Sequence, residues 1–492
     1  MLATNTQADM PNQPLSTRSK ALAINLDPAR YGTFAEIGAG QEVVRWFFQA
    51  GGAAGTIAKS ISAYDMKVSD AIYGKTTRYV CRERLEAMLA YEQHLNTTRL
   101  DETRGETTAF FTFADTVSAR NYHGTNECHG WMGVRFQAGP RRPSSQIILH
   151  VRMLDLENAL QQEALGIVGV NLLYGACVFA DQPDRLLESL LDSLSVERLE
   201  IDMVELSGEA FERVDNRIMS LRLVQLGLTG AAMFAADGSV LQPSEFLRKK
   251  AVLVERGRFR PVTHVNLDML HTALAEFTSD HDIASGEVAP IMEITMRSLM
   301  TEGEIDLHDF ISRAEVLSTT GCTVMISDFF EYYRLAAYLA RYTDRRIAIA
   351  MGAGSLLELF DESFYTHLKG GILESFGRLF KNGLKIYVYP LRDRASGQLT
   401  TVENLPIPSP LSQLYGYLVA CRSIESLERI NHELLDIFSH EVLEKIRSGE
   451  HAWEHCVPDA VATAIKARAL FGYRPRPGFE VPSAPASGPS AK

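Results

Sequence analysis

Two hydrophobic patterns alternate along the second half of the chain. Short continuous apolar runs, such as Cys322–Ile326 and Ile347–Met351, are typical of strands that are buried on both faces. Between these two runs, Tyr332–Tyr342 carries apolar residues at helical spacing. A buried strand followed by a helix, repeated along the sequence, predicts a parallel sheet that is covered by helices.

The alternation begins near residue 147 and continues to residue 389. The predicted strands are 147–153, 199–205, 231–235, 262–267, 289–296, 322–327, 347–351 and 384–389, and 252–255 competes with 231–235 for one place. The predicted helices are 157–175, 213–227, 243–250, 268–277, 306–319, 329–342, 355–367, 371–381 and 411–423. Strand–helix units of this number and length predict an α/β protein with a (β/α)8 (TIM-like) barrel, and an open doubly wound parallel sheet is the alternative.

The remaining segments complete the predicted domain organisation. Residues 1–22 are polar and 473–492 are rich in Pro, Ser and Ala, so both predict disordered tails. Residues 23–105 predict a helical N-terminal region, and 424–472 predict C-terminal helices. Residues 106–423 would then be a barrel-like catalytic or ligand-binding domain.

Composition narrows the class of protein. A net charge of -12 argues against a partner that is a nucleic acid or an anionic membrane. The N-terminus lacks the apolar core of a secretory signal, and no apolar run is long enough to span a membrane. Six scattered cysteines without a C-x-x-C pair suit a reducing compartment. We therefore expect a soluble cytoplasmic protein, whose oligomeric state the sequence leaves open.

A glycine turn follows the predicted strand 347–351. In Gly352-Ala353-Gly354-Ser355, glycines allow a ligand to approach the backbone, and the first amides of the next helix point toward an anion. Barrel enzymes often bind phosphate at the loop after the seventh strand, and this turn follows the seventh predicted strand. The alternative is a tight turn without a ligand.

The segment 123–131 concentrates reactive side chains. It contains His123, Asn126, Glu127, Cys128 and His129 together with two glycines, Gly124 and Gly130, which predicts a specially shaped loop. Such side chains supply acids and bases or bind substrate. Metal binding is the weaker interpretation, because no second pair of ligands occurs at metal-binding spacing.

Polar residues also cluster at the predicted carboxyl ends of strands. They are Arg152, Asp155, Glu205, Asn266, Asp268, Glu293, Thr295, Ser327, Asp328 and Arg392. In a barrel these side chains would meet at one mouth, where carboxylates serve as bases or Mg²⁺ ligands and arginines bind phosphate. The alternative is that several of them, Asp155 and Asp268 above all, cap helices.

A second glycine motif, at 36–40, lacks the sequence context of a nucleotide-binding turn. Glu36-Ile37-Gly38-Ala39-Gly40 matches the letters of a nucleotide-binding or methyltransferase turn, but no convincing apolar strand precedes it.

Several long strings resemble a widespread family of bacterial proteins of similar length. They are LDPARYGTFAEIGAGQEVVRWFF, FADTVSARNYHGTNECHGWMGVRFQ, QQEALGIVGVNLLYGA and GGILESFGRLFKN, within residues 25–390. Members of that family carry inconsistent labels, nicotinate-nucleotide adenylyltransferase and TonB-dependent receptor. The sequence lacks the H-x-G-H of the first and the signal peptide and strand pattern of the second. The resemblance therefore implies membership without residue roles.

Together these observations predict an enzyme that acts on a small phosphorylated or nucleotide-like metabolite, with Mg²⁺ as a possible cofactor. The expected catalytic residues are His123, Glu127, His129, Glu293 and Asp328. The expected ligand-binding residues are Asn126, Arg152, Asn266, Gly352, Gly354, Ser355 and Arg392. The alternatives are a non-catalytic ligand-sensing or scaffold protein and, from the label alone, a nucleotidyltransferase of pyridine-nucleotide metabolism.

Overall fold

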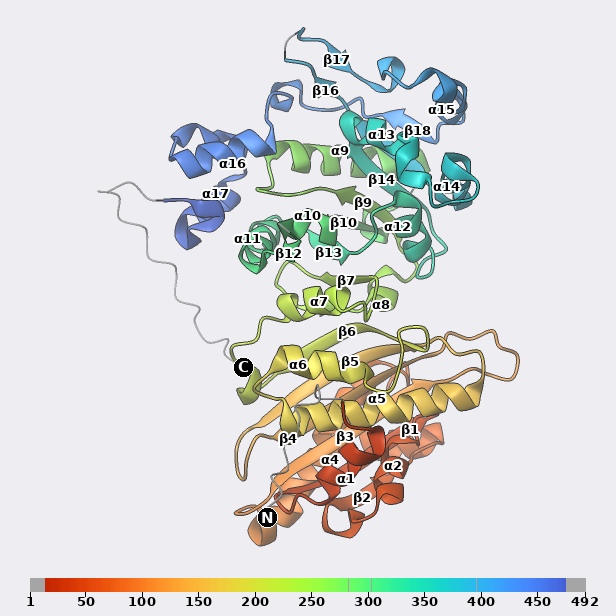
Figure 1. Cartoon of the computed structure of the whole chain (residues 1–492), viewed down its shortest axis with the longest axis vertical. Coiled ribbons are helices and arrows are strands. Elements are labelled where there is room, and N and C mark those ends of the chain that lie inside the picture. Colours follow the sequence, from red (N-terminus) through yellow and green to blue (C-terminus); the bar gives the residue numbers. More distant parts are fainter. Residues whose placement is uncertain (1–13, 282, 302, 395, 475–492) are drawn as a thin grey trace, which may run out of the picture. The chain divides into compact units, whose positions relative to one another are not determined.

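The computed structural model describes residues 14–281, 283–301, 303–394 and 396–474 (Figure 1). The chain divides into two compact units, the N-terminal unit Met1–Thr229 and the C-terminal unit Gly230–Lys492. Each unit is built on its own open sheet covered by helices. The boundary between the two units therefore lies inside the predicted domain 106–423.

The N-terminal unit contains a six-stranded mixed sheet in the order β2-β1-β3-β4-β5-β6. Its strands are β1 (Arg30–Gly38), β2 (Ile57–Ile61), β3 (Ala109–Ser118), β4 (His129–Gln137), β5 (Ser144–Met153) and β6 (Leu199–Ser207). Strand β1 runs parallel to β2 and β3, whereas β3 to β6 form an antiparallel meander.

Helices cover both faces of this sheet. They are α1 (Thr17–Asn25), α2 (Val43–Ala50), α3 (Met66–Tyr73), α4 (Arg82–Arg104), α5 (Asn158–Val178), α6 (Pro183–Glu188) and α7 (Asn216–Gln225). Helices α1, α2 and α5 share one apolar core with Phe111 and Phe113, and Figure 1 shows α5 running along the sheet. Helix α4 covers the other face, where its Asn96 contacts Thr33 and Thr112. The alternation of side chains along β3 separates these two layers.

The C-terminal unit contains an eight-stranded sheet in the order β18-β15-β14-β9-β10-β13-β7-β8. Its strands are β7 (Ala231–Phe234), β8 (Val240–Leu241), β9 (Ala251–Arg256), β10 (Val288–Thr295), β13 (Thr323–Ser327), β14 (Ile347–Gly352), β15 (Lys385–Tyr389) and β18 (Ile424–Ser426). Six of them, from β13 across to β18, are parallel, and β7 and β8 add an antiparallel edge. In chain order the parallel strands lie third, second, first, fourth, fifth and sixth.

Helices again lie on both faces. They are α8 (Pro243–Leu247), α9 (His264–His281), α10 (Met296–Leu299), α11 (Leu307–Ser318), α12 (Tyr332–Leu339), α13 (Ala353–Leu359), α14 (Gly371–Leu379), α15 (Ser412–Ala420), α16 (Ser439–Ser448) and α17 (Asp459–Arg468). Two short antiparallel ribbons pair β11 (Met300–Thr301) with β12 (Glu304–Ile305), and β16 (Leu391–Arg392) with β17 (Leu399–Thr400). Helices α12 to α15 share a core with Val252 and Val254, whereas α9 packs on the face to which Glu255 points.

The predicted strands are largely confirmed, but the predicted barrel is wrong. Seven of the eight predicted strands exist, and 252–255 is a further strand, β9, rather than a competitor of β7. The predicted strand 262–267 is instead the turn and first residues of α9. Within the described residues both large sheets are open. In the N-terminal sheet β3 to β6 are antiparallel, and in the C-terminal sheet the parallel strands reverse their order at β9.

The predicted terminal regions also change. The predicted helical region 23–105 contains the strands β1 and β2. Polar residues interrupt both sequences, so neither shows the continuous apolar run of a buried strand, although β1 pairs with strands on both sides and β2 with one. Helix α1 begins at Thr17, inside the predicted tail 1–22. Residues 424–472 contain the expected helices and also β18. Residues 1–13 and 475–492 of the two predicted tails lie outside the described residues.

Candidate functional site

The carboxyl ends of the six parallel strands meet at one edge of the C-terminal sheet. Successive strands are added on one side of β9 as far as β13, and then on the other side from β14 onward. The loops that leave β9 and β14 therefore diverge to opposite faces. In open α/β sheets, the crevice at such a reversal is the usual position of a ligand.

Glu255 occupies this reversal, one residue before the end of β9. Its side chain is fully buried, and its neighbour on β14 is the small residue Ala350. The amide of Asn266 on α9 donates to Oε1 of Glu255 at 2.9 Å, whereas Oε2 has no partner among the described residues. Burial raises the pKa of Glu255 to about 8. The carboxyl group can therefore give or take a proton near neutral pH.

Asn266 links Glu255 to the start of α9. Its Oδ1 accepts from the amide and the hydroxyl of Thr263, each at 3.0 Å, at the start of α9. Its amide nitrogen is occupied by Glu255. All three bonds are internal, so Asn266 positions Glu255 and fixes the first turn of α9.

The next strands hold a buried ion pair. Arg256 donates to both carboxylate oxygens of Glu293, at 2.8 and 2.9 Å, and also to the carbonyl of Phe330. Ser327 donates to the same carboxylate, and the Arg256 guanidinium stacks on Tyr332. Glu293 is fully buried with its oxygens occupied. It therefore stabilises the sheet edge and is not available as the predicted base.

The predicted glycine turn 352–355 lies at the same edge. An added Cβ at Gly352 or Gly354 would meet nothing within 4 Å, so there is open space beside both residues. Helix α13 has only seven residues, which makes its N-terminus a weak attraction for anions by itself. The structure thus offers room at this turn and little charge.

Two further predicted residues follow neighbouring strands. Asp328 follows β13 and is exposed. Arg392 lies in β16, and its guanidinium is bound by Asp436 at 3.0 Å and by the carbonyl of His432 at 3.3 Å. Neither is shown in contact with the turn.

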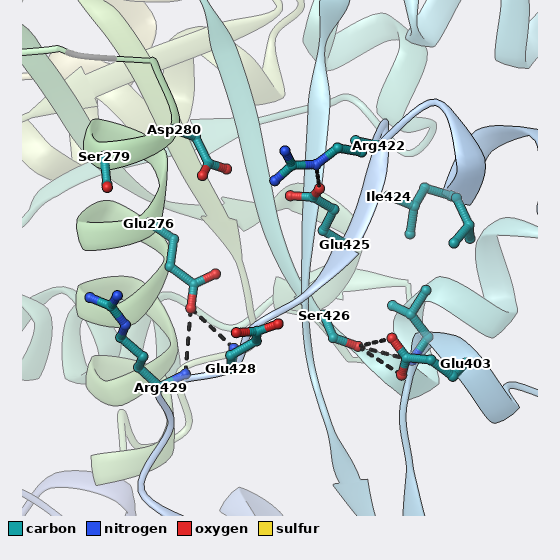
Figure 2. A pocket seen from close by; sticks show the side chains of 12 residues that line it. Glu276, Ser279, Asp280, Glu403, Arg422, Ile424, Glu425, Ser426, Glu428 and Arg429 are labelled. Atoms are coloured by element: carbon teal, nitrogen blue, oxygen red, sulfur yellow. Dashed lines mark hydrogen bonds and ion pairs between the residues drawn. The ribbon is translucent and has the colours of Figure 1, made fainter.

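Two cavities of the C-terminal unit differ in charge. One, of about 370 Å³, lies between α9 and β18 and is lined by five carboxylates, Glu276, Asp280, Glu403, Glu425 and Glu428, with Arg422 and Arg429 (Figure 2). Glu276 turns inward to accept the amides of Glu428 and Arg429. The other, of about 860 Å³, lies beside α12 and α14 and is lined by five basic residues, Arg334, Arg341, Arg345, Arg378 and Lys381, against Asp344. Only the second cavity suits an anion.

The predicted loop 123–131 belongs to the N-terminal unit. His123 and Glu127 are exposed. Asn126 holds the loop together, because its side chain accepts the amide of Asn121 and donates to Ser118 and Ala119. The structure therefore gives Asn126 a structural role.

His129 and Arg152 lie on neighbouring strands at one edge of the same sheet. His129 ends the loop and begins β4, and it faces Arg152 of β5. Arg152 pairs with Glu200 at 3.1 Å. His129 contacts His150, which in turn contacts Asp202, so the three form a buried chain.

The excluded glycine motif at 36–40 does connect a strand to a helix. Gly38 ends β1, and α2 begins at Val43. The reason for excluding it was therefore wrong. However, Glu36 accepts the amides of Val43 and Val44, at 2.9 and 3.2 Å, and so occupies the groups that would hold an anion.

Sequence reasoning missed Glu255, His150 and Asp202. Glu255 lies in the predicted strand 252–255, which competes with 231–235. A carboxylate inside the apolar run VLVE is a signal of a functional or paired side chain, because charged residues are rarely fully buried unless they are paired. His150 and Asp202 lie within two predicted strands, and only the pairing of β5 with β6 brings them together.

Comparisons with known proteins show only a distant structural resemblance over part of the chain. No family model and no curated protein matches the chain. Among solved structures, competence/damage-inducible protein CihA from Agrobacterium tumefaciens is 14% identical over 33% of this chain and 97% of its own, with a TM-score of 0.25. A CinA superfamily protein from Enterobacter cloacae is 13% identical over 36% and 99%, with a TM-score of 0.24. Part of the chain thus distantly resembles these proteins, at a level that carries no argument about activity.

Membrane-spanning helices and metal-binding clusters are both absent from the described residues. None of their helices is both long and apolar enough to cross a membrane. No three or more His, Cys, Asp or Glu side chains are grouped there in a way that could hold a metal ion. All six cysteines are free thiols.

Proposed function

We propose that this protein is an enzyme acting on a small phosphorylated or nucleotide-like metabolite, which binds where β9 and β14 diverge in the C-terminal unit. The observation that carries the proposal is the position of Glu255, a buried carboxyl with one unpartnered oxygen, at the reversal of strand order. The order of the parallel strands is that of doubly wound dinucleotide-binding folds. Fold alone does not imply function, so the side chain matters more than the topology.

Glu255 would be the acid or base of the reaction. A carboxyl with a pKa of about 8 is mostly protonated at neutral pH and can donate a proton to a leaving group. Asn266 would keep Oε1 in place and leave Oε2 for the ligand. Gly352, Gly354 and Ser355 would give the phosphate room at the opposite side of the crevice.

After β9, an arginine side chain would bind the phosphate that a glycine-rich loop binds in other doubly wound folds. Strand β9 ends at Arg256, and the turn after it contains one glycine, Gly257, and the arginines Arg258 and Arg260. Arg256 and Arg260 are paired with Glu293 and Asp309, whereas Arg258 is exposed and has no ion pair among the described residues. Arg258 is therefore the cation that supports phosphate binding at this edge.

The basic cavity beside α12 and α14 is the rival position for the phosphate. Arg341, Arg345 and Lys381 line it without an ion-pair partner among the described residues. Most of its lining precedes β14 and β15, at the amino edge of the sheet. Variants of Gly354 and of Arg345 distinguish binding at the strand reversal from binding in the basic cavity.

A thermal-shift measurement with ADP, NAD⁺ and glucose 6-phosphate tests the proposal. A ligand at 100 times its Kd stabilises the native state by about 2.7 kcal/mol and raises the melting temperature. Gly354→Trp would fill the crevice and abolish the shift. Gly416→Trp on α15 is the matched control, because an added Cβ there also meets nothing within 4 Å.

The outcomes are distinct. If none of the three probes raises the melting temperature, the proposed ligand class is wrong. If Arg345→Glu abolishes the shift and Gly354→Trp does not, the ligand binds in the basic cavity. If a probe binds at the crevice but is never converted, the non-catalytic ligand-sensing alternative is favoured.

A further inference from the structure

The N-terminal unit contains a chain of three side chains that is independent of the crevice in the C-terminal unit. His129, His150 and Asp202 come from the neighbouring strands β4, β5 and β6. The pairing of β5 with β6 is irregular at this point, since His150 faces Met203 and Val151 faces Ile201, which leaves Asp202 as the extra residue. Bulges of this kind re-aim a side chain and often occur beside active sites.

The distances order the three side chains into one hydrogen-bonded chain. Nδ1 of His150 lies 2.6 Å from Oδ1 of Asp202, and Nε2 of His150 lies 2.9 Å from Nδ1 of His129. His150 and Asp202 are fully buried, whereas His129 is 9% exposed. Only the outer end of the chain is therefore close to solvent.

With both imidazoles neutral, the contacts assign a donor or an acceptor role to each ring atom of the chain. A carboxylate only accepts hydrogen bonds, so Nδ1 of His150 must carry the proton that it shares with Asp202. Nε2 of a neutral His150 is then an acceptor, and Nδ1 of His129 must donate to it. Nε2 of His129 is left with a free lone pair, and no hydrogen bond to it occurs among the described residues.

The surroundings keep this lone pair unprotonated. Burial, the neighbouring His150, and the positive charges of Arg78 and Arg152 lower the pKa of His129 to about 4, against the opposing effect of Asp202. His129 is therefore neutral throughout the physiological pH range. The same positive charges would favour negative charge that develops on a molecule bound there.

A purely structural role would leave His129 with both ring nitrogens occupied or buried. Instead the chain ends at Nε2 of His129, a residue that is 9% exposed and directly follows the loop 119–128. Trp131, which contacts His150 at a ring-centroid distance of 4.9 Å, also has a buried indole nitrogen without a partner. Two unused polar atoms therefore lie on adjacent positions of one sheet face.

We propose that the N-terminal unit carries a general-base centre in which His150 and Asp202 position His129 to deprotonate a water molecule that attacks a carbonyl substrate of the ester type. Nε2 of His129 takes one proton from water while the hydroxide oxygen forms a bond to the carbonyl carbon. The carbon–oxygen bond to the leaving group then breaks, and the leaving oxygen receives the proton from His129. The reaction needs no oxidant, metal or cofactor, and it uses no residue of the C-terminal unit.

Hydrolysis of p-nitrophenyl acetate by the full-length protein tests this centre. A general base contributes roughly 10²–10⁴-fold, so we expect His129→Gln to lower the rate by at least about tenfold. His94→Gln removes an exposed histidine of α4 in the same unit and should leave the rate unchanged within about twofold. The rate should fall only as the pH drops toward about 4.

Asp202→Asn tests the positioning residues. This variant should lower the rate and move the acid limb of the pH profile, which a loss of packing alone would not do. Nitrogen-15 NMR of the wild-type histidines provides a readout that does not depend on a folded variant, and it should show His129 protonated on Nδ1 and not on Nε2. An acid limb near the ordinary histidine pKa of about 6.5, a proton on Nε2, or a full rate in His129→Gln would each overturn the proposal.

Discussion

Two buried glutamates, Glu36 and Glu255, occupy similar positions in the two units but differ in their hydrogen bonds. Glu36 lies near the end of β1 and Glu255 near the end of β9, each before a helix that follows a parallel strand. Burial raises the pKa of both to about 8. Glu36 accepts two backbone amides of α2, whereas Glu255 accepts one side-chain amide and keeps one oxygen without a partner.

The difference teaches that a perturbed pKa alone does not identify a functional carboxyl. The Glu36 carboxylate occupies the N-terminal amides of α2, and its neighbour Asp115, whose two oxygens have no hydrogen-bond partner among the described residues, lies against Gly40. Glu255 has the same burial without those two amide bonds. The number of hydrogen-bond donors that face the carboxylate therefore distinguishes Glu36 from Glu255.

The largest expected effect is on the pH dependence of stability when Glu255 is replaced by Gln. Between the ordinary pKa of 4.5 and the folded pKa of about 8, the unfolded chain releases a proton that the folded chain retains, so the free energy of unfolding falls as pH rises. Glutamine does not ionise. We expect Glu255→Gln to exceed the wild type by on the order of 4 kcal/mol at pH 8.

Urea unfolding at pH 4.5 and pH 8 measures this difference. At pH 4.5 the two proteins should agree within about 1 kcal/mol, because the carboxyl is neutral in the folded state and only half ionised in the unfolded state. A wild type that is as stable as the variant at pH 8 would show that Glu255 ionises freely, and the proposed acid would lose its support.

The next effect compares the two glycine turns. At Gly40 an added Cβ would lie 2.2 Å from Oδ1 of Asp115, so Gly40→Ala should lower the free energy of unfolding by about 1–3 kcal/mol. At Gly352 the same atom meets nothing within 4 Å and φ is -73°. Gly352→Ala should therefore change stability by less than about 0.5 kcal/mol, as thermal denaturation of both variants would show.

The smallest effect concerns Glu36 itself. Glu36→Gln removes the ionisable group but leaves one oxygen for two amides, so the loss of an acceptor offsets the gain at high pH. We expect a net gain at pH 8 of about 1–2 kcal/mol, well below that of Glu255→Gln. Equal gains in the two variants, measured by the same urea titrations, would mean that the amide bonds to Glu36 contribute nothing.

Individual residues show how far sequence reasoning reached. The segment around His129 was selected because reactive side chains are dense there, and the structure does place His129 at the end of a buried chain. Asn266 and Glu293 were selected as strand-end residues, which they are, but their polar atoms are occupied by internal partners. Strand ends can be inferred from a hydrophobic run, whereas hydrogen-bond partners depend on residues far away in the chain.

By itself the sequence determined that this is an α/β protein with strands near 289–296, 322–327, 347–351 and 384–389, because continuous apolar runs bounded by turns need no distant information. Only the tertiary structure decided that the sheets are open, that β3 to β6 form a separate meander, and that Glu255 stands at a reversal of strand order. Strand order is set by long-range pairing, which no local pattern encodes. The same long-range pairing brings Asp202 to His150 and places Glu255 where one of its carboxylate oxygens has no hydrogen-bond partner among the described residues.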